Sequence, residues 1–174
     1  MAFTFTLEDG TGVTGANAYV SLADVKQYWD NMVYDYSGFT DEQLQQYIVK
    51  ATRNIDMIYG AKFVGTKYSS TQGLMWPRTD AYDMDDFYQS GVPDVVEYAT
   101  AEAAYLVSQG TSFLSDTADA GVKLDKVKVD VIEVEQEYSA SSPVDKQFPV
   151  INALIKPVLN TGKYGSGYKG LIRV

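Results

Sequence analysis

The sequence predicts a mainly α fold, namely a helical bundle of about four helices with a small β-ribbon and an extended C-terminal arm. Apolar residues recur at helical spacing in four segments, and valines alternate with other residues between the third and the fourth. Glycines crowd the end of the chain, where no helix is expected. A length of 174 residues suits one domain with a real core. We therefore expect a domain over residues 1–159 and an arm over residues 160–174.

The first half of the chain contains a strand pattern and two helix starts. Alternation over residues 3–7 predicts a short strand. Two capping boxes follow, one at Ser21 and one at Thr40, each with a suitable partner three residues later. The first predicts a helix with the apolar residues Leu22, Val25, Trp29 and Met32. The second predicts a long helix that ends at Gly60 and carries Leu44, Tyr47, Ile48, Ala51, Ile55 and Ile58.

The second half predicts a long loop, two further helices and a ribbon. Residues 61–91 show no sustained period and are expected to form a long ordered loop. Pro93 suits the first turn of a third helix, which has an alanine-rich face and ends at Gly110. Residues 127–138 alternate with a phase slip, which predicts a twisted β-ribbon. A last short helix carries Ile151, Leu154, Ile155 and Val158, and Pro157 limits its length.

The composition excludes several classes of function. The chain has no histidine and no cysteine. It therefore lacks the commonest general base, the commonest transition-metal ligand and any thiol, so Ser-His-Asp and HExxH sites are excluded. No apolar stretch approaches the roughly 20 residues of a membrane span, and the N-terminal residues do not resemble a signal peptide. We expect a protein without catalytic residues, metal or cofactor, and without a membrane partner.

The charge is negative overall but unevenly distributed. Asp and Glu outnumber Lys and Arg by 23 to 14, and the formal net charge is −9. Residues 146–174 contain no Asp or Glu, although they hold Lys146, Lys156, Lys163, Lys169 and Arg173. An acidic body should repel the phosphates of DNA, and only the basic arm could hold them, weakly and without sequence preference.

The stretch TQGLMWPRTDAYDMDD, residues 71–86, combines a Trp-Pro-Arg step with a run of aspartates. Counting from Asp83, the positions at which an EF-hand needs Gly and Glu are Tyr88 and Asp94, so the calcium pattern fails. A solvated acidic loop is favoured over an adventitious cation site. Trp76 and Leu74 are expected to anchor the loop to the helices. Arg78 could stack on the tryptophan ring, pair with an aspartate, or contact a partner protein.

Several segments together resemble one known family. EDGTGVTGANAYVSLADVKQYW, IVKATRNIDMIYGAKFVG, TQGLMWPRTD, KVKVDVIEVEQEY and FPVINALIKPVL occur in the order found in small tailed-phage head-tail adaptor proteins, often labelled DnaT-like ssDNA-binding. The likeness covers roughly residues 7–160. The ANAYVS and TQxLxWPR elements carry most of it, and the residues that match the second are Thr71, Gln72, Leu74, Trp76, Pro77 and Arg78. The sequence departs from the family in its longer loop at residues 80–91.

The resemblance implies a structural virion protein at the head–tail interface. Such a subunit forms a homo-oligomeric ring, typically twelvefold, that docks on the portal protein and meets tail or neck proteins. Genomic double-stranded DNA passes through without sequence-specific binding, and an acidic lumen would prevent sticking. The alternative is a single-stranded-DNA-binding accessory protein of replication, as the family label says.

The glycine-rich arm lies outside the resemblance, and its expected role rests on its chemistry. We expect it to contact the portal through the cationic and apolar residues Lys163, Tyr164, Tyr168, Lys169, Leu171, Ile172 and Arg173. An ordinary frayed terminus is the alternative.

Overall fold

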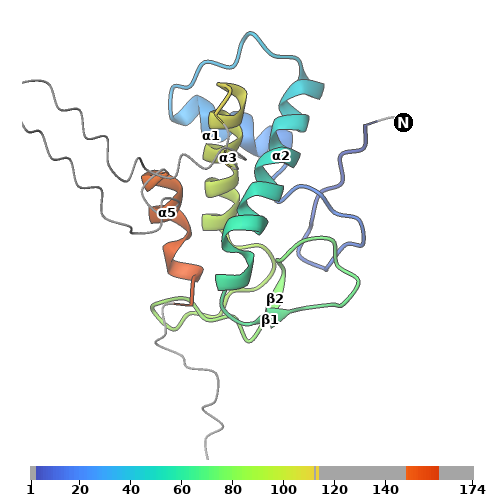
Figure 1. Ribbon diagram of the computed structural model, residues 1–174, viewed down its shortest axis with the longest axis vertical. Coiled ribbons are helices and arrows are strands. Elements are labelled where there is room, and N and C mark those ends of the chain that lie inside the picture. Colours follow the sequence, from blue (N-terminus) through green and yellow to red (C-terminus); the bar gives the residue numbers. More distant parts are fainter. Residues whose placement is uncertain (1–2, 112, 114–147, 161–174) are drawn as a thin grey trace, which may run out of the picture.

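A computed structural model describes residues 3–111, 113 and 148–160 (Figure 1). It contains the α-helices α1 (Leu22–Asn31), α2 (Asp41–Tyr59), α3 (Asp94–Ser108) and α5 (Pro149–Ile155). The 3₁₀-helices Gly60–Lys62 (η1) and Lys156–Val158 (η2) extend α2 and α5. The predicted bundle of about four helices is thus confirmed.

Both predicted capping boxes begin helices. The side chain of Ser21 accepts a hydrogen bond from the Asp24 amide at 3.2 Å. At the start of α2 the box is reciprocal, because Thr40 accepts from the Gln43 amide at 3.3 Å while the Gln43 side chain accepts from the Thr40 amide at 2.9 Å. The caps satisfy amides that a helix terminus would leave without partners.

The end of α2 differs from the expected glycine cap. Gly60 keeps a helical φ of −53° and the chain continues into η1, so the residue does not form a left-handed stop. A Cβ atom built at this position would lie 2.8 Å from Cγ of Met75. Gly60 is therefore required for the close approach of the loop, and not for its backbone freedom.

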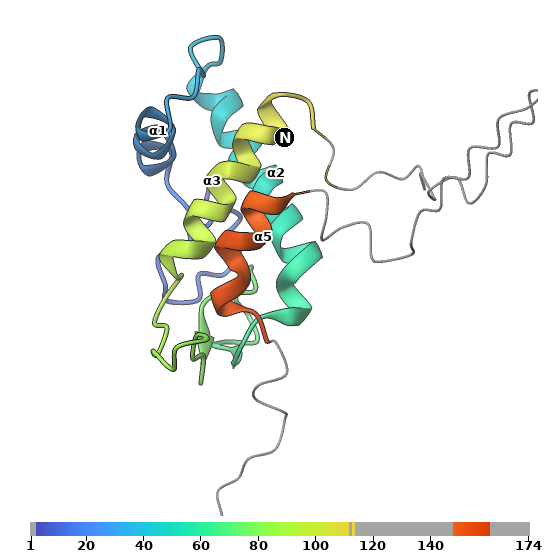
Figure 2. The same cartoon turned by 90° about the vertical axis from the view of Figure 1, so that its left-hand side faces the viewer.

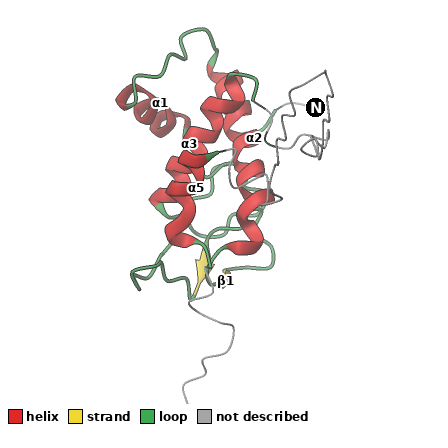
Figure 3. Cartoon of the chain, turned by 60° about the vertical axis from the view of Figure 1, so that its left-hand side comes forward, coloured by secondary structure: helices red, strands yellow, loops and turns green. Residues whose placement is uncertain are grey.

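Helix α3 packs against α2 and α5, and these three helices form the body of the molecule (Figure 2). The predicted alanine-rich face explains the close packing, because Ala99, Ala101, Ala103 and Ala104 are all fully buried. α1 crosses one end of this body (Figures 1 and 3), and its buried Trp29 donates a hydrogen bond from Nε1 to the Ala101 carbonyl at 2.9 Å. Phe113 and Phe148 stack beside α3 and α5, with ring centroids 4.1 Å apart.

The boundaries of α3 agree with the prediction to within one or two residues. Pro93 lies at the N-cap with ψ at 142°, one position before the expected first turn, and its carbonyl accepts from the amides of Val96 and Glu97. At the other end, Gly110 has a φ of +83° and follows the cap residue Gln109. A left-handed glycine at this place is the usual helix stop.

The β-structure within the described residues lies where a loop was expected. Strands β1 (Thr66–Lys67) and β2 (Arg78–Thr79) form an antiparallel pair at the end of the bundle opposite α1 (Figure 1). The ribbon predicted over residues 127–138 falls outside the described residues. The strand expected at residues 3–7 is wrong, since in the described part of the chain this segment forms a single bridge, between Leu7 and Ala18. The Asn17 side chain takes the place of further backbone pairing there, because Oδ1 accepts from the Thr6 amide at 2.9 Å and Nδ2 donates to the Thr4 carbonyl at 2.8 Å.

Candidate functional site

Tyr19 and Asp56 connect three segments that are far apart in the sequence. The hydroxyl of Tyr19, in the ANAYVS segment, donates a hydrogen bond to the Asp56 carboxylate on α2. The same oxygen accepts from the amides of Met75 and Trp76, each at 3.1 Å. The other carboxylate oxygen of Asp56 also accepts from the Met75 amide, at 3.1 Å. The two segments that carry the resemblance therefore meet at one place, which we call the tyrosine–aspartate joint.

Burial controls the protonation of this joint. Removal from water raises the pKa of the Asp56 carboxyl to about 6, although hydrogen bonds from Tyr19 and the Met75 amide and the charges of Lys67 and Arg78 act in the opposite direction. Burial, reinforced by the charge of Asp56, raises the pKa of the Tyr19 hydroxyl well above its ordinary value. The tyrosine thus remains a donor at every physiological pH.

The core holds the apolar side chains of the TQGLMWPR segment. Trp76 is fully buried and Leu74 nearly so. The indole ring contacts Phe63 edge-on, with centroids 5.7 Å apart, and the peptide bond from Trp76 to Pro77 is cis. The indole Nε1 has no hydrogen-bond partner among the described residues. Among the described residues, the ring is therefore held by packing.

Gln72 closes the segment upon itself. Its carboxamide oxygen accepts from the Ser69 amide at 2.7 Å. Its nitrogen donates to the carbonyls of Leu74 at 2.8 Å and Pro77 at 3.0 Å. The buried carboxamide thus replaces the backbone pairing that this irregular stretch lacks.

Arg78 takes a role that the sequence did not suggest. Its guanidinium donates to three backbone carbonyls, those of Val64 at 2.6 Å, Gly65 at 2.7 Å and Met75 at 3.2 Å. Neither ring stacking on Trp76 nor an ion pair of Arg78 with an aspartate is found within the described residues. The side chain joins the two sides of the loop inside the subunit.

Residues 80–91 form an ordered hairpin loop, which we call the 80–91 hairpin. The carboxylate of Asp83 organises it, because Oδ1 accepts from the amides of Asp85 at 2.9 Å and Phe87 at 3.0 Å, and Oδ2 accepts from Nε2 of Gln89 at 2.8 Å. Tyr82 and Tyr88 form a bridge, with their rings in edge contact. The acidic loop is therefore folded around one of its own aspartates.

The hairpin displays apolar side chains to solvent. Phe87 is 69% exposed, and Tyr82, Met84 and Tyr88 are each about half exposed. The Met84 amide donates to the Pro157 carbonyl at 2.9 Å, which ties the hairpin to η2. Clustered exposed aromatic side chains on an ordered support are typical of surfaces that bind another polypeptide.

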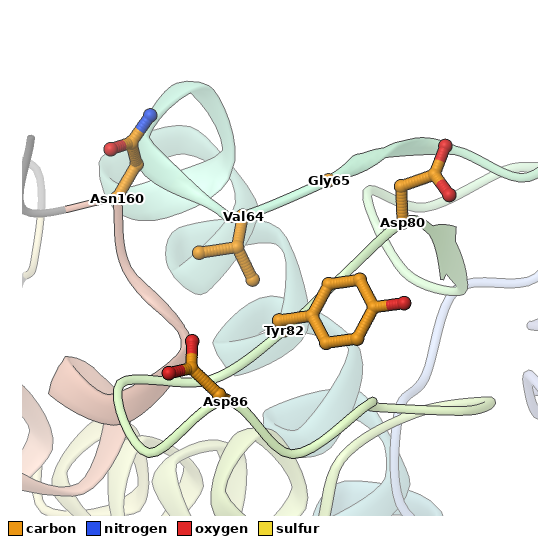
Figure 4. A pocket seen from close by; sticks show the side chains of 6 residues that line it. All are labelled: Val64, Gly65, Asp80, Tyr82, Asp86 and Asn160. Carbon is orange, nitrogen blue, oxygen red and sulfur yellow. The ribbon is translucent and has the colours of Figure 1, made fainter. Parts of the chain in front are cut away.

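A groove of about 450 Å³ lies between the hairpin and the segments that follow α2 and α5 (Figure 4). Its lining residues are Val64, Gly65, Asp80, Tyr82, Asp86 and Asn160. In Figure 4, Asp80 and Asp86 lie on opposite sides of the groove, with Val64 and Tyr82 between them. The groove thus combines an apolar floor with two carboxylates.

Sequence reasoning missed two buried or partly buried carboxylates that accept hydrogen bonds from tyrosine hydroxyls, Asp56 and Glu102. Glu102 on α3 accepts hydrogen bonds from the hydroxyls of Tyr28, at 2.9 Å, and Tyr34, at 3.1 Å. Burial, aided by Glu102, raises the pKa of both tyrosines. The sequence does show Glu102 among the alanines of the third helix. It does not reveal the tyrosines that contact this carboxylate, because they lie about 70 positions away.

The described residues interact through packing, hydrogen bonds and the ion pair between Lys26 and Asp41. No group of three or more Asp or Glu side chains in this part of the chain is arranged to hold a metal ion. None of its helices is long and apolar enough to cross a membrane. The expected arm residues Lys163, Tyr164, Tyr168, Lys169, Leu171, Ile172 and Arg173 lie outside the described residues.

Comparison with known proteins identifies the family. No curated protein and no solved structure matches the chain. One family model matches residues 3–174, and its description is "Putative DnaT-like ssDNA binding protein". Of the two functions left open by the sequence, this description names the second, and it does not mention a virion. The match spans nearly the whole chain, so the protein belongs to the DnaT-like ssDNA binding protein family.

Proposed function

We propose that the protein is a non-enzymatic structural subunit of a tailed-phage virion, a head-tail adaptor that joins the portal to the tail. The observation that carries this proposal is the surface of the 80–91 hairpin, which exposes Tyr82, Met84, Phe87 and Tyr88 on an ordered support. Such a surface suits contact with another protein better than contact with a polyanion, because aspartates are interleaved with the apolar side chains.

The placement of the cations supports the same proposal. Lys26 forms an ion pair with Asp41 at 2.6 Å, and Arg78 is directed at backbone carbonyls. These two side chains are engaged within the subunit, whereas Lys50, Arg53 and Lys62 are exposed. Lys and Arg are in any case the minority among the charged residues of the chain. A ring of acidic subunits would let genomic DNA slide through its channel without adhering.

In this proposal the subunits form a homo-oligomeric ring at the head–tail interface and need no cofactor. The hairpin contacts a neighbouring protein, either another subunit or a tail or neck protein. The basic residues of the arm, Lys163, Lys169 and Arg173, contribute attraction to the portal.

Single-stranded-DNA binding is the second candidate function, and the family description favours it. Exposed aromatic rings such as those of Tyr68 and Phe87 could stack on unpaired bases, and the arm could supply cations. The aspartates beside Phe87 oppose this, since they would repel the phosphates between the stacked bases.

Two measurements separate the candidates. The protein is co-expressed with the portal and capsid proteins of a tailed phage, and the purified heads are imaged for an added ring. In parallel, the affinity for a fluorescent oligothymidine is measured at low and at moderate salt. An added ring together with weak DNA binding supports the adaptor. Bare portals, together with tight binding that falls steeply with salt, would support the DNA-binding function instead.

A further inference from the structure

We propose that the basic segment of residues 161–174 docks in the acidic groove beside the 80–91 hairpin of its own chain. The inference concerns the free subunit, before its arm meets the portal or a nucleic acid. It rests on the chemistry of the groove, on the place where the described chain ends, and on the charge of the residues that follow.

The groove offers two carboxylates that lack partners within the described residues. The side chains of Asp80 and Asp86 form no hydrogen bond and no ion pair there. This distinguishes them from Asp83, whose carboxylate accepts three hydrogen bonds within the hairpin. Asp80 and Asp86 are therefore the carboxylates of the groove that remain available to a cation.

The groove also offers apolar surface. Tyr82 is 46% exposed although its backbone is fixed by the bridge to Tyr88, and Val64 contributes to the floor (Figure 4). The occupant should therefore alternate cationic and aromatic side chains. Lys163-Tyr164 and Tyr168-Lys169 provide this pattern twice.

The proposed occupant, residues 161–174, directly follows a residue that lines the groove. Asn160 lines the groove, and its backbone amide is fixed by a hydrogen bond to the Lys62 carbonyl at 2.7 Å. Lys163 follows three positions later, a reach of about 10 Å for an extended chain. A tether this short produces a high effective concentration, so the segment of the same chain has an advantage over that of a second copy.

The experiment uses the absence of cysteine from the chain. Ser166→Cys introduces a single thiol between Lys163 and Lys169, and a nitroxide is attached to it in the otherwise intact ¹⁵N-labelled protein. Broadening of the amide signals of Gly65, Tyr82 and Asp86 reports how closely the segment approaches. The covalent connection through Asn160 by itself keeps the nitroxide near the groove and causes some broadening. The test is therefore the difference in broadening between the variants.

Asp80→Asn with Asp86→Asn removes both charges and preserves the backbone, because each residue has a positive φ that Asn tolerates. Asp85→Asn is the matched control, since it makes the same change on the same hairpin outside the groove lining. We expect the broadening to fall at least about twofold in the double variant and to remain in the control, because the attraction depends on opposite charges at short range.

Two results would overturn the inference. Equal broadening in all three proteins would show that the segment samples the neighbourhood without docking. The second result comes from mixing ¹⁵N-labelled chain without nitroxide and unlabelled chain with nitroxide. Broadening in that sample would place the segment in the groove of a second copy.

Discussion

At the scale of single residues, the tyrosine–aspartate joint concentrates three long-range connections on one hydroxyl. Tyr19 donates to Asp56 and accepts from two amides of the TQGLMWPR segment. Because Tyr19 is 1% exposed, water cannot replace these bonds if the hydroxyl is removed. The joint therefore ties the fold of the loop to the helices.

Tyr19→Phe should lower the free energy of unfolding by about 1–3 kcal/mol, since it leaves the Trp76 amide without its partner and Asp56 with the Met75 amide as its remaining donor. Urea unfolding followed by circular dichroism measures the change. Tyr68→Phe is the control, because Tyr68 is 59% exposed and should change stability little. Equal stabilities of the two variants would contradict the role given to the joint.

Glu97 leads to a prediction about pH. Burial, with help from the charges of Asp94 and Asp24, raises the pKa of Glu97 to about 7, above its ordinary 4.5. A carboxyl whose folded pKa is raised contributes stability that is fully present below pH 4.5 and is lost as the pH rises through 7. Glu97→Gln, neutral throughout, should therefore equal wild type near pH 4.

Near pH 8 the Glu97→Gln variant should be more stable than wild type, by on the order of 1 kcal/mol after allowance for solvent screening of a half-buried group. Thermal melts between pH 4 and 8 measure the difference between the two proteins. Glu42→Gln, at an exposed position on α2, should show no such trend. A constant difference across the pH range would argue against a raised pKa at Glu97.

At the scale of elements, sequence patterns predicted what is local and missed what is not. The two capping boxes and the apolar stripes define α1 and α2, because a helix start depends on residues three positions apart. The burial of Trp76 could be expected from its size and from the proline beside it. The hydrogen-bond partners of Arg78 could not be predicted. They are backbone carbonyls up to 14 positions away, and a backbone carbonyl carries no sequence signal.

The short pair of strands could not be predicted for a related reason. β1 and β2 contain two residues each, too few for an alternation pattern, and their pairing depends on how Gln72 and Arg78 close the intervening loop. The aromatic residues of the 80–91 hairpin were visible in the sequence, whereas the central role of Asp83 depends on the turn geometry of the folded loop.

The loop between β1 and β2 should depend on its tryptophan. Trp76→Ala should cost about 3–5 kcal/mol, the range observed for truncation of large buried aromatic residues. Calorimetry gives the loss, and Trp76→Phe should retain a substantial part of the stability because Nε1 makes no hydrogen bond within the described residues. A Trp76→Ala protein that melted with wild type would mean that the ring does not anchor the loop.

At the scale of the whole molecule, the buried core and the exposed aromatic surface lie in different places. Burial is concentrated where α2, α3 and α5 meet, while Phe87, the most exposed aromatic side chain among the described residues, lies on the hairpin at the end opposite α1. Stability and assembly should therefore respond to different substitutions.

Phe87→Ser should change the free energy of unfolding by no more than about 0.5 kcal/mol, as is usual for exposed positions. In the adaptor proposal it should nevertheless reduce incorporation into portal-bearing heads, which quantitative gel analysis of purified heads measures. Met57→Ser provides the comparison, because Met57 is similarly exposed on α2. Wild-type incorporation of the Phe87→Ser variant would remove the hairpin from the proposed interface.

The stacked pair Phe113 and Phe148 has a consequence for how the length of the chain between them can vary. The two rings lie 4.1 Å apart, so the chain leaves the body and returns to it at one point. Helix α5 is held by its own packing on α3 through Ile151 and Ile155 and does not depend on the length of the connection before it. Since the entropy of closing a loop grows only slowly with its length, the point between Phe113 and Phe148 is a position where the length of the chain can change during evolution without moving the helices. A chain in which a short glycine-serine linker replaces residues 114–147 should keep the same helical body.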